Sequence, residues 1–188
     1  MKRLVSIILA VCLILSVAVS VAACNRPQEY NGIYVINILF LFSDEQFDYI
    51  FKVLSSDGEV DGETLEAFAK TITVESNGTE RYLFGEGGLF QEIENALEGL
   101  GGETALSVFT EYLERYNSDH GMVGNEEGYL IPLQGESLYM QSFTDLARQI
   151  YFNSASPAAS VGNSFIDGKL AYCVTVFGAH IIMIKSLA

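Results

Sequence analysis

The sequence predicts an α+β fold, in which helices cover a small mixed or antiparallel sheet. The run Ile33–Phe42 is long, β-branched and aromatic, which is typical of a central strand buried on both faces. After it, segments with helical spacing of apolar residues alternate with short strands, and the chain ends in two strands joined at Phe177-Gly178. This mixture of elements favours the α+β class over an all-helical or a parallel α/β fold.

The segment 44–87, directly after the first strand, is interpreted as one insertion. Apolar residues at helical spacing predict a helix over 44–54 and a second, short one over 63–70. A β-hairpin is predicted over 71–84, because Asn77-Gly78 between two β-prone runs is a strong turn signal.

The remaining elements follow from the same patterns. Amphipathic helices are predicted over 89–97 and 104–116, where large apolar residues recur on one face. The expected elements beyond them are a loop over 117–127, a strand over 129–131, a helix over 143–151, a loop over 154–162, and strands over 170–175 and 180–184.

The N-terminus reads as an export signal. Lys2 and Arg3 precede an apolar run that ends in Val21-Ala22-Ala23-Cys24, and this end resembles the lipobox of bacterial lipoproteins. We therefore expect Cys24 to carry lipid at the outer face of the bacterial membrane, with two acyl chains giving stable anchoring. The alternative is an uncleaved transmembrane anchor, since the run is long enough to span a bilayer. A short tether over 25–31 would then lead into one domain over 32–188.

The composition excludes some function classes. A net charge of −14 makes binding to nucleic acid or to anionic phospholipid improbable. Asp57, Glu59 and Asp61 resemble a calcium loop only faintly, because the closing glutamate is not at the required spacing. No metal-ligand or phosphate-loop spacing is present, so we expect no cofactor. Cys173 is expected to be a buried strand residue, with a catalytic thiol as the lesser alternative.

Three motifs together resemble the parvulin family of peptidyl-prolyl cis/trans isomerases. The first is the loop Tyr116–Gly121, of the form Tyr-x-x-Asp-x-Gly, and the second is the pair Tyr139 and Phe143. The third, and the most specific, is Phe177-Gly178-x-His180-Ile181-Ile182 at the end of the chain. The resemblance implies a four-stranded parvulin-like sheet and covers most of the domain apart from the insertion.

The resemblance also implies a site. His180 falls on the family's histidine, Asp119 on its Asp-or-Cys position and Thr175 on the threonine of its polar network. The proline pocket would be formed by side chains that fall on or beside the family's apolar positions: Phe143, Tyr139, Met140 and Phe177.

Two departures bear on catalysis. The first strand carries Asn37 where the family usually has a histidine, and the run 125–130 lacks the usual glycine-rich pattern. Asn37 is the one polar residue within a predicted buried strand, so it must have a hydrogen-bonding partner. Its amide can replace an imidazole as donor and acceptor, although it does not titrate.

Three functions follow as expectations. The first is a lipid-anchored isomerase that helps exported proteins fold, whose partners are unfolded or proline-containing polypeptides. The second is the same fold with a decayed site, which binds such segments as a chaperone without turnover. The third is an unrelated lipoprotein that shares only the C-terminal motif.

Overall fold

The computed structural model describes residues 30–56, 58–76 and 78–188, and the chain divides into two units, 1–30 and 31–188. The predicted signal sequence, Cys24 and most of the tether therefore lie outside the described residues. None of the helices in the described part is long and apolar enough to cross a membrane.

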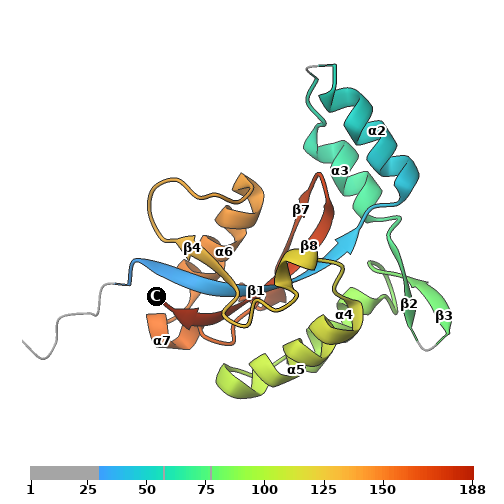
Figure 1. The fold of residues 1–188 in the computed structure, drawn as a ribbon. Coiled ribbons are helices and arrows are strands. Elements are labelled where there is room, and N and C mark those ends of the chain that lie inside the picture. The colour runs from blue at the N-terminus through green and yellow to red at the C-terminus, as the bar shows by residue number, and fades with distance from the viewer. Residues whose placement is uncertain (1–29, 57, 77) are drawn as a thin grey trace, which may run out of the picture. The chain divides into compact units, whose positions relative to one another are not determined.

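The second unit is built on a four-stranded antiparallel sheet with the strand order β4-β1-β8-β7 (Figure 1). Its strands are β1 (Gly32–Leu41), β4 (Tyr129–Pro132), β7 (Tyr172–Thr175) and β8 (Gly178–Leu187). The prediction of a central first strand is confirmed, since β1 pairs with β4 on one side and with β8 on the other. The α+β class is confirmed, and of the two sheet types left open the antiparallel one is present.

Helices cover both faces of this sheet (Figure 1). Neighbouring residues of a strand point to opposite faces, so alternate residues of β1 enter two different cores. Ile36 and Ile38 pack with α4 (Leu89–Leu97) and α5 (Gly102–Tyr116), whereas Ile33 and Val35 pack with α6 (Gln141–Asn153). We call these two sides the α5 face and the α6 face.

The segment 44–87 contains α2 (Asp44–Leu54), α3 (Gly62–Ala69) and a two-stranded sheet of β2 (Thr73–Ser76) and β3 (Thr79–Tyr82). Helix α2 begins at a capping box between Ser43 and Gln46. The paired strands cover 73–82, within the hairpin predicted over 71–84. At its base, Leu83 N donates to the backbone oxygen of Ile72 at 2.8 Å, and both residues are buried.

Two predictions in the C-terminal third are wrong. The predicted loop 154–162 contains a short helix, α7 (Pro157–Ser160), which Ser156 caps and proline at the first turn favours. The predicted strand 170–175 is interrupted at Ala171, because β6 (Lys169–Leu170) turns back through Asp167-Gly168 to pair with β5 (Phe165–Ile166). Both turn residues have positive φ, as a tight hairpin requires.

Candidate functional site

The predicted polar residues converge on the α6 face of the sheet. A cavity of about 400 Å³ opens there, and we call it the cup. The residues that line it come from β1, the loop after α5, the first residue of β4, the segment that leads into α6 and its first turn, and β7 and β8 with the turn between them. They are Asn37, Leu39, Leu41, Ser118, Asp119, His120, Gly121, Tyr129, Tyr139, Met140, Phe143, Thr175, Phe177 and His180. All eight predicted catalytic and substrate-binding residues are among them.

Strand register brings the histidine and the threonine together. His180 of β8 lies opposite Leu39 of β1 and opposite Cys173 of β7, and Thr175 follows two residues after Cys173 on the same face. Thr175 Oγ1 lies 2.9 Å from His180 Nε2 and accepts the backbone N–H of Phe177 at 3.1 Å.

Gly178 makes the tight β7–β8 turn possible. Its φ is +149°, and a Cβ atom there would lie 2.0 Å from the backbone oxygen of Phe40. Only glycine permits this approach of the turn to β1, which explains the Phe177-Gly178 pair in physical terms.

The loop after α5 is fastened to β1 by Asn117. Its Oδ1 accepts the backbone N–H groups of Leu39 at 2.9 Å and of Asp119 at 3.0 Å, while Ser118 N donates to Leu39 O at 3.0 Å. These bonds hold Asp119 beside Asn37, which lies two residues before Leu39 on the same face of β1. Asn37 Nδ2 donates to Asp119 Oδ2 at 2.8 Å.

The sequence did not identify Tyr129 as a site residue. Its hydroxyl donates to Asp119 Oδ2 at 2.9 Å, and Gly121 N donates to Asp119 Oδ1 at 2.9 Å. A Cβ atom at Gly121 would lie 2.3 Å from the Tyr129 hydroxyl, so the glycine of the loop motif makes room for this bond. Burial is the main cause that raises the pKa of Tyr129, followed by its bond to Asp119, and the phenol stays a donor.

The hydrogen bonds run in one direction through the cup. Because the Asp119 carboxylate only accepts, the amide nitrogen of Asn37 faces it and the amide oxygen faces His180 Nδ1 at 3.2 Å. His180 therefore carries its proton on Nδ1, and Nε2 accepts from the Thr175 hydroxyl. Hydrogen bonds thus connect five side chains in series, and we call this series the polar chain: Thr175, His180, Asn37, Asp119 and Tyr129.

Burial determines the protonation state of the histidine. His180 is 7% exposed, and desolvation lowers its pKa from 6.5 to about 4, against a smaller raising effect of Asp119. The imidazole is thus neutral at pH 7. Asn37, which is fully buried, satisfies both the imidazole N–H and the carboxylate without adding a second titrating group.

Aromatic rings form the wall above the polar chain. The Phe143 ring lies edge-to-face against the His180 imidazole, with centroids 5.4 Å apart, and Tyr139 lies 6.0 Å from Phe143. Tyr129 contacts Tyr139 at 5.0 Å, so its ring belongs to the wall while its hydroxyl belongs to the polar chain. Phe177 is 51% exposed and stands at the mouth of the cup.

Two other candidates have no place in this arrangement. Cys173 is half-buried on β7, and burial raises the pKa of its thiol to about 12, so a thiolate is not available at neutral pH. Within the described residues, no group of three or more histidine, cysteine, aspartate and glutamate side chains is arranged to hold a metal ion.

In comparisons with protein-family models, with curated proteins and with solved structures, none matches this chain.

Proposed function

We propose that residues 31–188 form a parvulin-like peptidyl-prolyl cis/trans isomerase that acts on exported polypeptides, held at the outer face of the membrane through lipid on Cys24. The observation that carries the proposal is the convergence of Asn37, Asp119, Thr175 and His180, from four separate segments, beneath the Phe143 ring. A small apolar cup with a fully hydrogen-bonded polar base suits a proline ring and the amide before it.

The aromatic wall binds the proline ring of the substrate. Proline is apolar and compact, and the edges and faces of Phe143 and Tyr139 offer it a concave surface of about the right size. Met140, at the start of α6, and Phe177 flank the opening and bound the path of the substrate chain.

The polar chain supplies the electrostatics. Rotation about the X-Pro bond faces a barrier of about 20 kcal/mol, because the planar amide delocalises charge onto its carbonyl oxygen. A carboxylate beneath that oxygen disfavours the delocalised form, and the twisted form has less charge there. Asp119 thus lowers the barrier by destabilising the planar state relative to the twisted one.

His180 acts as a positioning residue in this scheme. Isomerisation breaks no σ bond and needs no proton transfer, so a neutral imidazole suits the task. Its Nδ1–H fixes Asn37, and Asn37 fixes the Asp119 carboxylate. Asn37, at the position where the family usually has a histidine, therefore keeps the polar chain continuous, because its amide replaces a second imidazole.

A second candidate is a chaperone that binds proline-containing or unfolded segments without turnover. It is favoured by the apolar side chains exposed around the mouth of the cup, where Leu41 is 41% and Phe177 51% exposed. Such a surface binds extended apolar chain whether or not the bond rotates.

One pair of assays separates the candidates. The full chain in detergent is added to a client whose refolding is limited by a proline isomer, and to a second client that aggregates on dilution. The isomerase accelerates the first in proportion to its concentration, and Asp119→Asn removes the acceleration, whereas Asp48→Asn on the exposed surface of α2 does not. Suppressed aggregation with unchanged refolding rates would support the chaperone, and no effect in either assay would refute both.

A further inference from the structure

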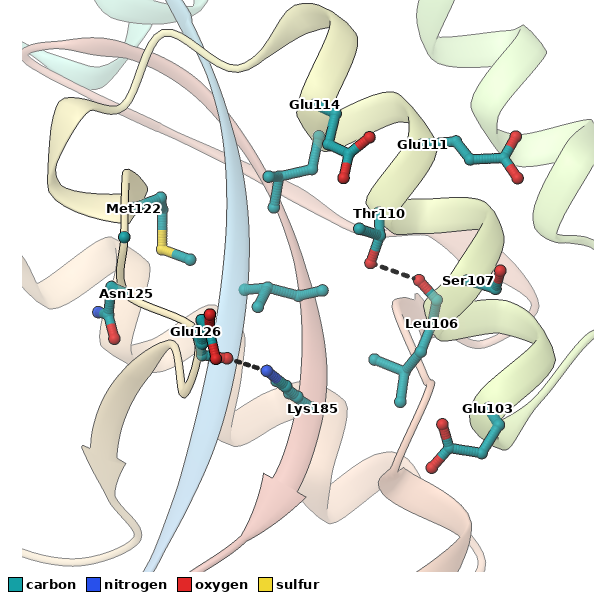
Figure 2. Close-up of a pocket in the computed structure, with 13 residues that line it drawn as sticks. Glu103, Leu106, Ser107, Thr110, Glu111, Glu114, Met122, Asn125, Glu126 and Lys185 are labelled. Atoms are coloured by element: carbon teal, nitrogen blue, oxygen red, sulfur yellow. Dashed lines mark hydrogen bonds between the residues drawn. The ribbon is translucent and has the colours of Figure 1, made fainter.

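A second hollow lies on the α5 face of the sheet, opposite the cup. It has a volume of about 700 Å³ and runs between α5 and the loop 122–126, over Ile36 of β1 (Figure 2). We call it the groove. Because Ile36 and Asn37 are neighbours on one strand, they point to opposite faces, and the groove and the cup open independently.

The floor of the groove is apolar. Ile36 and Met122 are buried at its base, and Leu106 and Leu113 of α5 remain partly exposed within it. Leu106, Thr110 and Leu113 follow the helical repeat, so they form one stripe along the side of α5 that faces the loop. Leu106 and Leu113 pack in part against the core of the α5 face, and the rest of their surface lies open in the groove.

The rim of the groove is acidic. Glu103, Glu111 and Glu114 project from α5, and Glu126 lies on the loop across from them (Figure 2). All four glutamates are exposed. None of them forms a salt bridge, because the one salt bridge among the described residues joins Arg81 and Glu92, which lie outside the groove. Among the described residues that line the groove, Lys185 is the one cation, and it donates to the backbone carbonyl of Glu126.

The shape and the charge together define an occupant. Glu103 and Glu114 lie about 16 Å apart along the helix axis, at 1.5 Å per residue, so the carboxylates do not converge on one ion. They mark the ends of a stretch of α5 about three turns long, with Leu106 and Leu113 between them. Such a stretch suits a second helix of that length with apolar residues on one side and lysine or arginine on its borders. From this complementarity we infer that the groove docks a basic amphipathic helical segment of another polypeptide.

This inference does not depend on isomerase activity. The occupant contacts α5 and the loop 122–126, whereas a proline ring would lie in the cup on the other face. Both ligands therefore bind at the same time, and a proline-containing peptide does not compete with the occupant of the groove.

Fluorescence anisotropy tests the inference with defined probes. The first probe is a synthetic leucine-lysine peptide of about three helical turns with all leucines on one side. The second has the same composition in scrambled order, and spermine serves as a competitor that has charge but no apolar face. The full chain in detergent should bind the amphipathic peptide at least about tenfold more tightly than the scrambled one, and spermine should displace it poorly.

Matched variants localise the binding. The triple variant E103Q/E111Q/E114Q should weaken binding of the amphipathic peptide about tenfold. The control E45Q/E59Q/E86Q removes the same charge from exposed positions outside the groove, and Glu45, like Glu103, lies in the first turn of a helix. The control should change the affinity less than about twofold.

A steric variant supplies an independent reading. Ser107 is exposed and lines the groove, so Ser107→Trp fills the groove without disturbing the core and should abolish binding. Equal losses in both triple variants, or equal binding of both peptides, would show diffuse attraction to an acidic protein and overturn the inference. Unchanged binding by Ser107→Trp would overturn it as well.

Discussion

The buried neutral histidine makes stability depend on pH in a defined window. The pKa of His180 is about 4 in the folded chain and 6.5 when the imidazole is exposed, so between these values the unfolded chain binds a proton that the folded chain does not. The contribution of His180 to stability is therefore fully present above pH 6.5 and is lost as the pH falls toward 4. The full difference corresponds to about 3 kcal/mol, of which about 2 kcal/mol is lost between pH 7.5 and pH 5.

The substitution His180→Gln isolates this contribution. Glutamine does not titrate, yet it keeps a donor and an acceptor for Asn37 and Thr175. Both proteins are unfolded in urea at pH 7.5 and at pH 5. The difference between their losses of stability cancels the contributions of the other ionisable side chains, because both proteins contain them. The unsubstituted chain should lose about 2 kcal/mol more than the variant on acidification.

The reasoning would be refuted by equal losses in the two proteins. It would also be refuted if the unsubstituted chain lost less stability than the variant, since that would mean a folded-state pKa above 6.5. Direct titration of the His180 ring protons by NMR should place the midpoint near pH 4.

Three further predictions concern packing and reactivity. Gly178→Ala should lower the free energy of unfolding by several kcal/mol, because the added Cβ would meet the backbone oxygen of Phe40. The control Gly135→Ala, in open space with φ +79°, should lower it by about 1 kcal/mol. Equal losses in urea unfolding would contradict the packing argument. Asn37→Leu should lower the free energy of unfolding by about 2 to 3 kcal/mol in the same measurement, because the His180 N–H loses its acceptor and the Asp119 carboxylate loses a donor. An unchanged free energy would mean that water replaces both hydrogen bonds. Cys173 should resist a thiol reagent at pH 8 in the folded chain and react in urea, as mass spectrometry of the labelled peptides would show, and rapid labelling of the folded chain would contradict the burial that raises the pKa of its thiol to about 12.

Local patterns predicted most of the secondary structure. The apolar run of β1 and the helical spacing in α2 and α4 set these elements to within about two residues. The short helix α7 and the β5–β6 hairpin were missed because each contains only a few residues, too few for a periodic pattern. Ser156-Pro157 and Asp167-Gly168 were their only local signals.

The candidate site was predicted in part. The resemblance pointed to Asn37, Asp119, Thr175 and His180, and the structure brings their side chains into one polar chain. Tyr129 was missed because its role depends on the space left by the absent side chain of Gly121, which no spacing in the sequence reveals.

Asn117 and the groove were missed for related reasons. Asn117 looks like an ordinary helix-terminal residue until its bond to Leu39 joins two segments that are 78 residues apart. The glutamates of α5 look like a solvated helix face, and they form a rim only because the loop 122–126 lies across from them. Tertiary contacts of this range have no local signature in a single sequence.

Two-dimensional exchange NMR on an X-Pro peptide tests the central claim most directly. In the presence of catalytic amounts of the full chain, the cis and trans forms should show exchange cross-peaks on a timescale at which the free peptide shows none. The cross-peaks should vanish with Asp119→Asn and persist with Asp48→Asn. Binding of the peptide without exchange would contradict catalysis by the cup, and exchange that survives Asp119→Asn would show that the polar chain does not lower the barrier.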